Sequence, residues 1–338
     1  KMKIKKINVG IIGNGVVGKR RAHFIKQNKN YSLKYISDIS FKKDTKIKGI
    51  HLFKNYNKII SLKPDAVFVT LPNYLAAKVT KKLLMNGIHV FCEKPPGKNL
   101  SEIKSVKKVE KNNKNLKLKY GFNHRYHGSI KLAKKILNKG TYGKILNVRA
   151  VYGKSKIVTY GKNEWRSKKK YSGGGILLDQ GIHLLDLISF LHGEFVEFKS
   201  FISNKYWKYD VEDNAFALMR DKKGIVASIH STATQWQHKF NIEITLEKCL
   251  MTLSGILSGT KTYGEEKLAI TFKDKNINKK PRMKVFTFKS DDSWRDEVNE
   301  FADIIKKNKK IKTGNSEQAL KVMTMIDMIY KNDRKWTK

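Results

Sequence analysis

The chain has 338 residues, 40% of them hydrophobic, and this length predicts about two domains. It has no run of about 18 uncharged apolar residues, so we expect no membrane span. The formal net charge is +42, but 62 of the 71 basic residues are lysines spread along the chain, whereas nucleic-acid readers rely on arginine forks and aromatic platforms. We therefore expect a surface that attracts anionic ligands, with no specific nucleic-acid partner.

Strand and helix signals alternate through the first third of the chain. The predicted strands are 7–12, 33–38, 66–71, 88–92 and 116–122, and the predicted helices are 16–28, 73–86 and one that begins at Ser101. Strands and helices that alternate across short loops predict a parallel, doubly wound α/β sheet. We assign residues 1–124 to this first domain.

The pattern changes after about residue 125. A helix at 127–139 and a strand at 145–153 lead through a long basic loop, 154–171, to Gly173-Gly174-Gly175 and an apolar helix. Strand signals separated by turn residues then dominate from 194 to 288, which predicts an antiparallel sheet. Two helices, 294–308 and 316–330, end the chain. We assign residues 125–338 to a second α/β domain, whose last helices can pack back on the first.

A glycine-rich turn, Gly13-Asn14-Gly15-Val16-Val17-Gly18, joins the first strand to the first helix. Asp38 ends the next strand, 20 residues after Gly18, which is the spacing of a dinucleotide-binding site. Gly13 allows a tight turn, Gly15 lets backbone amides approach a pyrophosphate, and Gly18 lets the helix pack close to the strand. An ordinary strand–helix turn is the alternative, but the strand, helix and acid together favour the nucleotide site.

Asp38 also indicates which cofactor is bound. A carboxylate there accepts hydrogen bonds from the adenosine ribose and repels a 2′-phosphate, which favours NAD over NADP. Ser40, Lys42 and Lys43 follow directly and could weaken that preference.

Six stretches, in this order, resemble the Gfo/Idh/MocA oxidoreductases, a family named for glucose–fructose oxidoreductase and inositol dehydrogenase. They are GNGVVG (13–18), TLPN (70–73), CEKP (92–95), GFNHRYH (121–127), WR (165–166) and GGGILLDQGIHLLD (173–186). The resemblance implies an N-terminal Rossmann domain and a C-terminal α/β domain with an open, mostly antiparallel sheet. It also implies a nicotinamide cofactor, a sugar, cyclitol or other polyol substrate, and a homo-oligomer, dimer or tetramer, built through the exposed face of the C-terminal sheet.

The resemblance implies three catalytic residues, Lys94, Asp179 and His183. Oxidation of an alcohol needs a base for the hydroxyl proton while hydride leaves to the nicotinamide, and a histidine suits that base. Asp179 can orient His183, and Lys94 can stabilise charge on the substrate oxygen. The alternatives are a local cap for Asp179, a core histidine for His183, and a metal site with Asp186 that lacks a further ligand.

Further positions follow from the same resemblance. The expected cofactor contacts, besides residues 13–18 and Asp38, are Thr70, Leu71, Pro72, Asn73, Glu93, Lys94, Asn123, Trp165 and Arg166. The expected substrate contacts are Lys94, Arg125, Asp179, His183 and Trp236. Trp236 could equally be buried at a subunit contact, and Tyr74 stands where family members often have histidine.

These observations predict a cytoplasmic NAD-dependent oxidoreductase. The substrate is a sugar, a cyclitol or a nucleotide sugar, the last in bacterial surface-glycan biosynthesis. Cys92 and Cys249 form neither a metal motif nor a disulfide framework, which suits a reducing compartment. The alternatives are a non-catalytic NAD-binding regulator and, least favoured, a basic nucleic-acid-binding protein.

Overall fold

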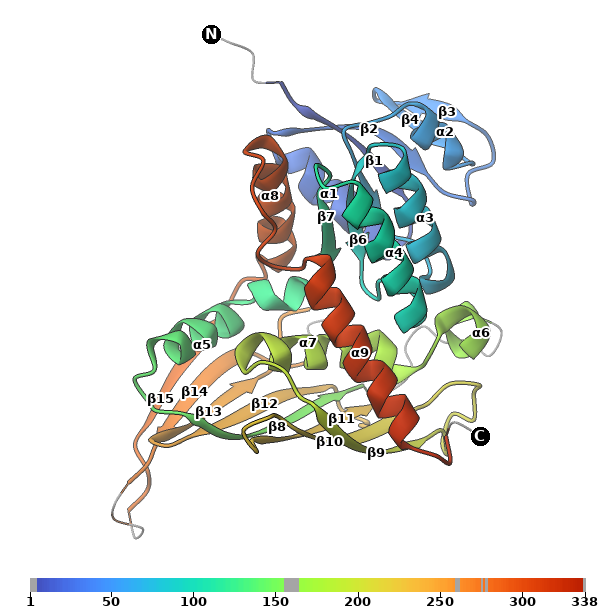
Figure 1. Cartoon of the computed structure of the whole chain (residues 1–338). Helices are drawn as coiled ribbons and strands as arrows, with labels where there is room; N and C mark the ends of the chain where they lie inside the picture. The colour runs from blue at the N-terminus through green and yellow to red at the C-terminus, as the bar shows by residue number, and fades with distance from the viewer. Residues whose placement is uncertain (1–4, 155–163, 259–261, 275, 277–278, 337–338) are drawn as a thin grey trace. The chain divides into compact units, whose positions relative to one another are not determined.

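We describe a computed structural model of the chain, covering residues 5–154, 164–258, 262–274, 276 and 279–336 (Figure 1). Contacts between residues divide the chain into two compact units. Unit 1 comprises residues 1–122 and 294–320, and unit 2 comprises 123–293 and 321–338. The boundary between the units falls at the end of the last strand of unit 1.

Unit 1 is built on a seven-stranded sheet in the order β3-β4-β2-β1-β5-β6-β7. The strands are β1 (Ile7–Ile12), β2 (Tyr31–Ser37), β3 (Thr45–Ile47), β4 (Ile50–Phe53), β5 (Ala66–Val69), β6 (His89–Glu93) and β7 (Leu118–Gly121). Neighbouring strands run parallel except in the β3–β4 hairpin. The order of strands reverses at β1, and open α/β sheets bind ligands at such switch points.

The helices of unit 1 connect these strands. They are α1 (Val16–Gln27), α2 (Asn57–Ser61), α3 (Asn73–Met85), α4 (Leu100–Asn112) and, from the end of the chain, α8 (Ser293–Lys306). Phe68 and Phe91 stack at 4.8 Å between ring centroids, and Phe301 of α8 packs edge-on against each of them at 5.6 Å. A helix that begins 200 residues after the end of β6 thus completes the first hydrophobic core.

Unit 2 is built on an eight-stranded sheet in the order β15-β14-β13-β12-β8-β11-β10-β9. The strands are β8 (Ile145–Gly153), β9 (Glu197–Ser203), β10 (Asn214–Arg220), β11 (Val226–Thr232), β12 (Lys239–Leu246), β13 (Cys249–Ser254), β14 (Glu266–Phe272) and β15 (Met283–Phe288). Only β8 and β11 pair in parallel among these strands, so the prediction of a mostly antiparallel sheet is confirmed.

The sheet of unit 2 buries one face. Burial alternates along β10 and β12, as expected when one side of a sheet meets a core. Helices α5 (Gly128–Lys139) and α7 (Ile182–Leu191) lie on the same side of the sheet (Figure 1). The remaining elements are η1 (Asn123–Tyr126), η2 (Trp165–Ser167), α6 (Lys169–Ser172), the π-helical turn η3 (Leu177–Gly181) and α9 (Ser316–Asn332).

The structure differs from the predictions in three places. The elements β3, β4 and α2 were not predicted, because each is too short to show an apolar period. The basic loop 154–171 contains η2 and the start of α6, while residues 155–163 lie outside the described residues. The apolar helix begins as a π-helical turn before it becomes α7, and such turns are frequent at functional sites.

One described stretch, 169–191, is long and apolar enough to pass a membrane-span test based on length and composition. Its apolar window is 78% buried inside the protein, as expected for a core helix. The stretch corresponds to α6, η3 and α7, which pack within unit 2.

Candidate active site

The glycine turn of unit 1 has the geometry that a pyrophosphate site needs. Gly13 has φ +100°, which favours glycine, and a Cβ there would lie 2.5 Å from the Thr70 carbonyl oxygen. A Cβ on Gly18 would lie 2.0 Å from the Gly13 carbonyl oxygen, so helix and turn touch there. A Cβ on Gly15 would meet nothing within 4 Å, so this backbone borders open space. The three glycines therefore differ in their surroundings, and Gly15 is the one whose backbone borders open space.

Thr70 and Asp38 hold the turn from the ends of the neighbouring strands. The Thr70 Oγ1 hydroxyl donates to the Gly13 carbonyl at 2.6 Å. The Asp38 carboxylate accepts the N–H of Asn14 at 2.6 Å and that of Ser40 at 2.9 Å. Burial raises the pKa of Asp38, but the hydrogen bonds from Ser40 and Asn14 and the charge of Lys19 together lower that pKa below its ordinary value. Asp38 is thus a carboxylate at neutral pH.

Apolar side chains border the turn. Val16 and Ile39 are each 83% exposed, and Ile39 directly follows Asp38. Exposed aliphatic groups beside a carboxylate such as Asp38 suit the flat face of a nucleobase. Together with the glycines and Asp38, these residues fit a dinucleotide. Of the other expected cofactor contacts, Leu71 and Pro72 lie between β5 and α3, and Asn73 begins α3 with its side chain buried.

Glu93, the last residue of β6, belongs to a buried charge cluster in unit 1. The Arg21 guanidinium lies 2.6 Å from Glu93 Oε1 and 2.6 Å from Glu297 Oε2, and Arg21 is 0% exposed. Arg21 also lies between the rings of Phe91 and Trp294, 4.4 Å from each centroid. The cluster fixes the residue that immediately precedes Lys94.

Lys94 leaves the carboxyl end of β6, and its peptide bond to Pro95 is cis. Glu297 is the second carboxyl group in the Arg21 cluster. Burial raises its pKa to about 7, although the charges of Arg21 and Lys119 oppose the shift. Neither Arg21 nor Glu297 was predicted, because Arg21 contacts Glu93 across 72 residues and Glu297 across 276 residues.

In unit 2, a buried carboxylate shapes the triple-glycine segment. Glu212 accepts the N–H groups of Gly175 and Leu177 at 2.8 and 2.9 Å, and the Tyr330 hydroxyl donates to it at 2.8 Å. A Cβ on Gly175 would lie 2.2 Å from the Glu212 carbonyl oxygen, so glycine is required for this approach. This anchoring places the turn that carries Asp179.

Asp179 lies in the π-helical turn and His183 in the first turn of α7. The His183 ring is 3% exposed and stacks on the His124 ring at 3.7 Å between centroids. The pKa of Tyr152 in β8 is raised well above its ordinary value, chiefly by burial and to a smaller extent by Tyr263 and by the negative charge of Asp179. The pKa of Tyr263 is likewise raised by burial and by Asp179. The predicted base, His183, therefore stacks on His124 and lies 6.5 Å from Tyr152 between ring centroids, and the Tyr152 ring in turn meets that of Tyr263.

Arg125 and Asp186 form a buried ion pair. Arg125 Nε donates to Asp186 Oδ2 at 2.8 Å and Nη2 donates to Oδ1 at 2.5 Å. Arg125 is 4% exposed and Asp186 is 0% exposed. The guanidinium predicted to contact substrate thus holds the carboxylate of α7, three residues after His183. Among the described residues, no group of three His, Cys, Asp or Glu side chains is arranged to hold a metal ion.

Two predicted aromatic positions form separate contacts. The Arg166 guanidinium lies 4.4 Å above the ring of its neighbour Trp165. Trp236 is 60% exposed and packs edge-on against Tyr206 at 4.8 Å. Its neighbour His238 instead stacks on Tyr263 at 4.9 Å, so this segment turns His238 toward the tyrosines around Asp179.

Sequence reasoning missed His124, Tyr152 and Tyr263. His124 stands between two residues that were chosen, Asn123 and Arg125, and its ring chemistry was a usable signal. Tyr152 carried a weaker signal, since it lies at an inward position of an alternating strand. Tyr263 lies outside any strand, and nothing in its local sequence marks it.

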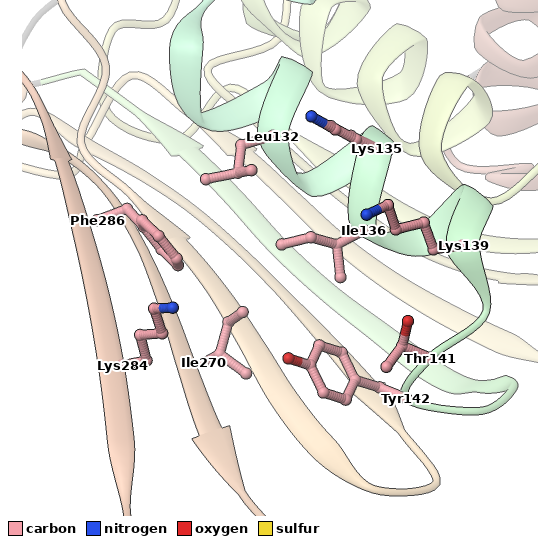
Figure 2. Close-up of a pocket in the computed structure, with 9 residues that line it drawn as sticks. All are labelled: Leu132, Lys135, Ile136, Lys139, Thr141, Tyr142, Ile270, Lys284 and Phe286. Atoms are coloured by element: carbon pink, nitrogen blue, oxygen red, sulfur yellow. The ribbon is translucent and has the colours of Figure 1, made fainter.

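A cleft of about 310 Å³ lies between α5 and the β14–β15 edge of the sheet (Figure 2). Its walls are apolar, and three lysines stand at its rim: Lys135, Lys139 and Lys284. None of the predicted site residues lines it. With 62 lysines in the chain, a basic rim carries little information about a ligand.

Unit 1 has the features of an NAD-binding Rossmann domain. These are an open parallel sheet, a glycine turn at its switch point and an ionised acid at the end of the second strand. Residues 7–122 match the family model of oxidoreductases with an NAD-binding Rossmann fold. Residues 130–251 match the model of the GFO/IDH/MocA C-terminal domain. The chain belongs to the Gfo/Idh/MocA oxidoreductase family, as predicted.

Curated relatives of this chain include sugar dehydrogenases. The chain is 27% identical over 247 residues to glucose-6-phosphate 3-dehydrogenase of Bacillus subtilis (strain 168), a match that covers 71% of this chain and 67% of that protein. For the next two curated relatives, the matched part covers 53% and 40% of their length.

Solved structures extend the likeness in fold to almost the whole chain. Levoglucosan dehydrogenase in complex with NADH and L-sorbose has a TM-score of 0.83 at 20% identity and covers 98% of this chain and 97% of that chain. The WlbA dehydrogenase from Bordetella pertussis, in complex with NADH and UDP-GlcNAcA, has a TM-score of 0.81 at 20% identity with the same coverage. These matches show a common fold.

Proposed function

We propose that this protein is an NAD-dependent dehydrogenase that acts on a hydroxyl or ketone of a sugar, a cyclitol or a nucleotide sugar. The observation that carries the proposal is the glycine turn closed by the ionised carboxylate of Asp38. This turn leaves open space above Gly15 for a diphosphate and presents an anion to an unphosphorylated ribose. The nicotinamide supplies the hydride acceptor or donor when it is bound.

Lys94, Asp179 and His183 are the proposed catalytic residues. His183 takes the proton of the substrate hydroxyl in the oxidative direction and returns it in the reductive direction. Asp179 lies four residues before it and stabilises the imidazolium that forms. Lys94 donates a hydrogen bond to the substrate oxygen and stabilises negative charge there.

The remaining predicted positions have supporting roles in this proposal. Glu93, held by Arg21, contacts the cofactor at its nicotinamide end, while Thr70, Leu71, Pro72, Asn73 and Asn123 line its path. Arg125 acts through Asp186 and positions α7, because its guanidinium is engaged there. Trp165, Arg166 and Trp236 offer exposed ring and guanidinium surfaces that suit a sugar.

The substrate class rests on the relatives and on charge. The relatives' names include enzymes of a sugar phosphate and of an anhydrosugar, and one structure holds a nucleotide sugar. A surface with a net charge of +42 favours anionic substrates such as a sugar phosphate or a nucleotide diphosphate sugar. Bacterial surface-glycan biosynthesis is the setting that fits the nucleotide-sugar alternative.

We also propose a homo-oligomer formed through the face of the C-terminal sheet opposite α5 and α7. Phe201, Phe216 and Leu218 are 78%, 47% and 55% exposed, and they lie on neighbouring strands β9 and β10. An apolar patch of this kind marks an interaction surface. Light scattering of the purified protein tests this, with Leu218→Glu expected to yield monomers. The buried, free thiols of Cys92 and Cys249 suit the cytoplasm.

Reduction of bound NAD by candidate sugars tests the function. Wild-type protein should reduce NAD with at least one sugar, while Lys94→Met and His183→Gln should lose at least 100-fold in kcat, about 2.7 kcal/mol. Lys223→Met, a substitution in the exposed β10–β11 turn, is the matched control and should keep wild-type turnover. Full turnover in His183→Gln would refute the catalytic assignment.

A further inference from the structure

His124 and His183 form a parallel ring pair in unit 2. Their centroids are 3.7 Å apart and their planes differ by 12°. Both residues are buried, at 9% and 3% exposure. Two imidazolium cations at this separation would repel each other strongly, so the pair accommodates only one proton beyond those of two neutral rings. Which ring carries that proton decides whether His183 can act as a base.

A directional hydrogen-bond chain sets the tautomer of His124. It begins at the carboxylate of Asp291, which only accepts, so the Ser293 hydroxyl donates to it at 2.5 Å. The Ser293 oxygen then accepts from Asn123 Nδ2 at 3.2 Å, which turns the Asn123 Oδ1 toward His124 Nδ1, also at 3.2 Å. Nδ1 of His124 must therefore carry hydrogen.

The other ring nitrogen of His124 faces a phenol. Nε2 lies 3.2 Å from the Tyr152 hydroxyl. Burial keeps the pKa of Tyr152 well above its ordinary value, so the phenol keeps its proton, and its hydroxyl also hydrogen-bonds to Tyr263. Tyr152 can therefore give its hydrogen to Nε2 of His124 while its oxygen accepts from the protonated Tyr263 phenol. In this arrangement Nδ1 of His124 bears a hydrogen and Nε2 accepts the hydrogen of the Tyr152 hydroxyl, so His124 is held as an uncharged imidazole.

The other titratable groups near the stack are His127, Glu266, Tyr152, Tyr263, Asp179 and Asp291. His127 meets the His124 ring edge-on at 5.5 Å, and its Nδ1 lies 2.7 Å from Glu266 Oε2. Burial raises the pKa of Glu266, but its bonds to His127 and Ser129 lower that pKa overall, so Glu266 is a carboxylate engaged by these two residues. Asp179, four residues before His183, adds a negative charge near Tyr152.

We propose that His124 is a positioning residue, held uncharged by Asn123 and Tyr152, which reserves the proton of the histidine pair for His183. This rests on the proposed dehydrogenase function. In the oxidative direction the substrate O–H bond breaks and its proton goes to His183, while the C–H electron pair leaves as hydride to the nicotinamide, which is reduced. The neutral His124 ring lies flat against the imidazolium that forms, a favourable contact for a cation.

Nitrogen NMR of the full-length protein labelled with ¹⁵N-histidine tests the proposal without any substrate. The His124→Gln and His183→Gln variants assign the two rings among the nine histidines. Between pH 5 and 8, His183 should take up a proton, whereas His124 should keep the Nδ1–H tautomer throughout. A wild-type protein in which His124 takes up the proton would overturn the proposal, whatever the outcome of the turnover assay.

Tyr152→Phe removes the hydroxyl that contacts His124 and Tyr263. In this variant His124 should take up a proton in the same pH range, and the midpoint of His183 should fall by at least one pH unit. The pH profile of kcat/KM should move with that midpoint, with KM for NAD unchanged. Tyr142→Phe, in the cleft of Figure 2, is the control and should leave both titrations as in wild type.

Unchanged titration of both rings in a folded Tyr152→Phe protein would contradict the role of the phenol. If Tyr152→Phe does not fold, the wild-type titration alone decides. If His124 is neutral but the protein reduces no NAD, the proposed role of His124 in the ring pair stands and the proposed dehydrogenase function is refuted.

Discussion

Gly15→Ala and Gly18→Ala should separate cofactor binding from folding at the glycine turn. A Cβ on Gly18 would lie 2.0 Å from the Gly13 carbonyl oxygen and 3.0 Å from the Gly13 carbonyl carbon, and backbone atoms cannot rotate away. Such overpacking costs about 1–3 kcal/mol, against a gain of roughly 1 kcal/mol in helix propensity. Because the clash at 2.0 Å is with a backbone atom, we take the upper end of that cost and expect NAD-free protein to lose about 2 kcal/mol of stability.

Gly15→Ala should behave in the opposite way. Its Cβ meets nothing within 4 Å and its φ is −70°, so the free protein should keep its stability within about 0.5 kcal/mol. The methyl group would occupy the space where a pyrophosphate approaches the backbone, and we expect NAD to bind at least tenfold more weakly, about 1.4 kcal/mol.

Urea unfolding of the NAD-free proteins and calorimetric titration with NAD measure the two effects, and each variant serves as the control for the other. If Gly15→Ala binds NAD as tightly as wild type, the pyrophosphate does not lie on this turn. If Gly18→Ala is as stable as wild type, helix and turn do not touch as described.

Three further substitutions test separate parts of the account. Asp38→Asn removes a carboxylate worth roughly 1.5–3 kcal/mol in hydrogen bonds to the ribose, so the NAD-to-NADP ratio of kcat/KM should fall at least tenfold, and an unchanged ratio would refute the assignment. Because its lowered pKa keeps Asp38 ionised, wild-type affinity for NAD should stay flat from pH 8 to pH 5. The pKa of Glu297 is raised from 4.5 to about 7, so the protonated carboxyl stabilises the fold fully below pH 4.5, and this stabilisation is lost as pH rises through 7. The free energy of unfolding in urea should therefore fall by roughly 3 kcal/mol over this range in wild type but not in Glu297→Gln. An equal pH dependence in both proteins would contradict this. Arg125→Met leaves the Asp186 carboxylate buried without its cation and should cost about 3–5 kcal/mol by urea unfolding, whereas a loss below about 1 kcal/mol would show that the ion pair matters little.

The nucleotide-binding unit could be predicted closely because its signals are local. The turn from Gly13 to Gly18 and the acid at Asp38 depend on spacing along one strand–helix–strand segment, and the structure joins Asp38 to the turn through the Asn14 amide. The same holds for the alternating strands of the second sheet, whose period is visible residue by residue.

The contacts that sequence reasoning could not supply join distant segments. Arg21 reaches Glu93 across 72 residues and Glu297 across 276 residues, and no local pattern marks these partners. The stack of His124 on His183 likewise depends on how η1 and α7 pack, which a motif search treats as two separate matches. The π-helical turn around Asp179 follows from the anchoring of the glycines by Glu212, a residue that lies 35 positions after Leu177.

Hydride transfer to bound NAD is the measurement that tests the central claim most directly. The protein is loaded with NAD and mixed with glucose 6-phosphate, levoglucosan, myo-inositol and UDP-GlcNAcA, and the absorbance of reduced nicotinamide is followed. The account predicts reduction by at least one of these compounds in wild type, and its loss in Lys94→Met and His183→Gln with NAD binding retained. Stoichiometrically bound NAD that none of them reduces, or turnover that survives both substitutions, would contradict it.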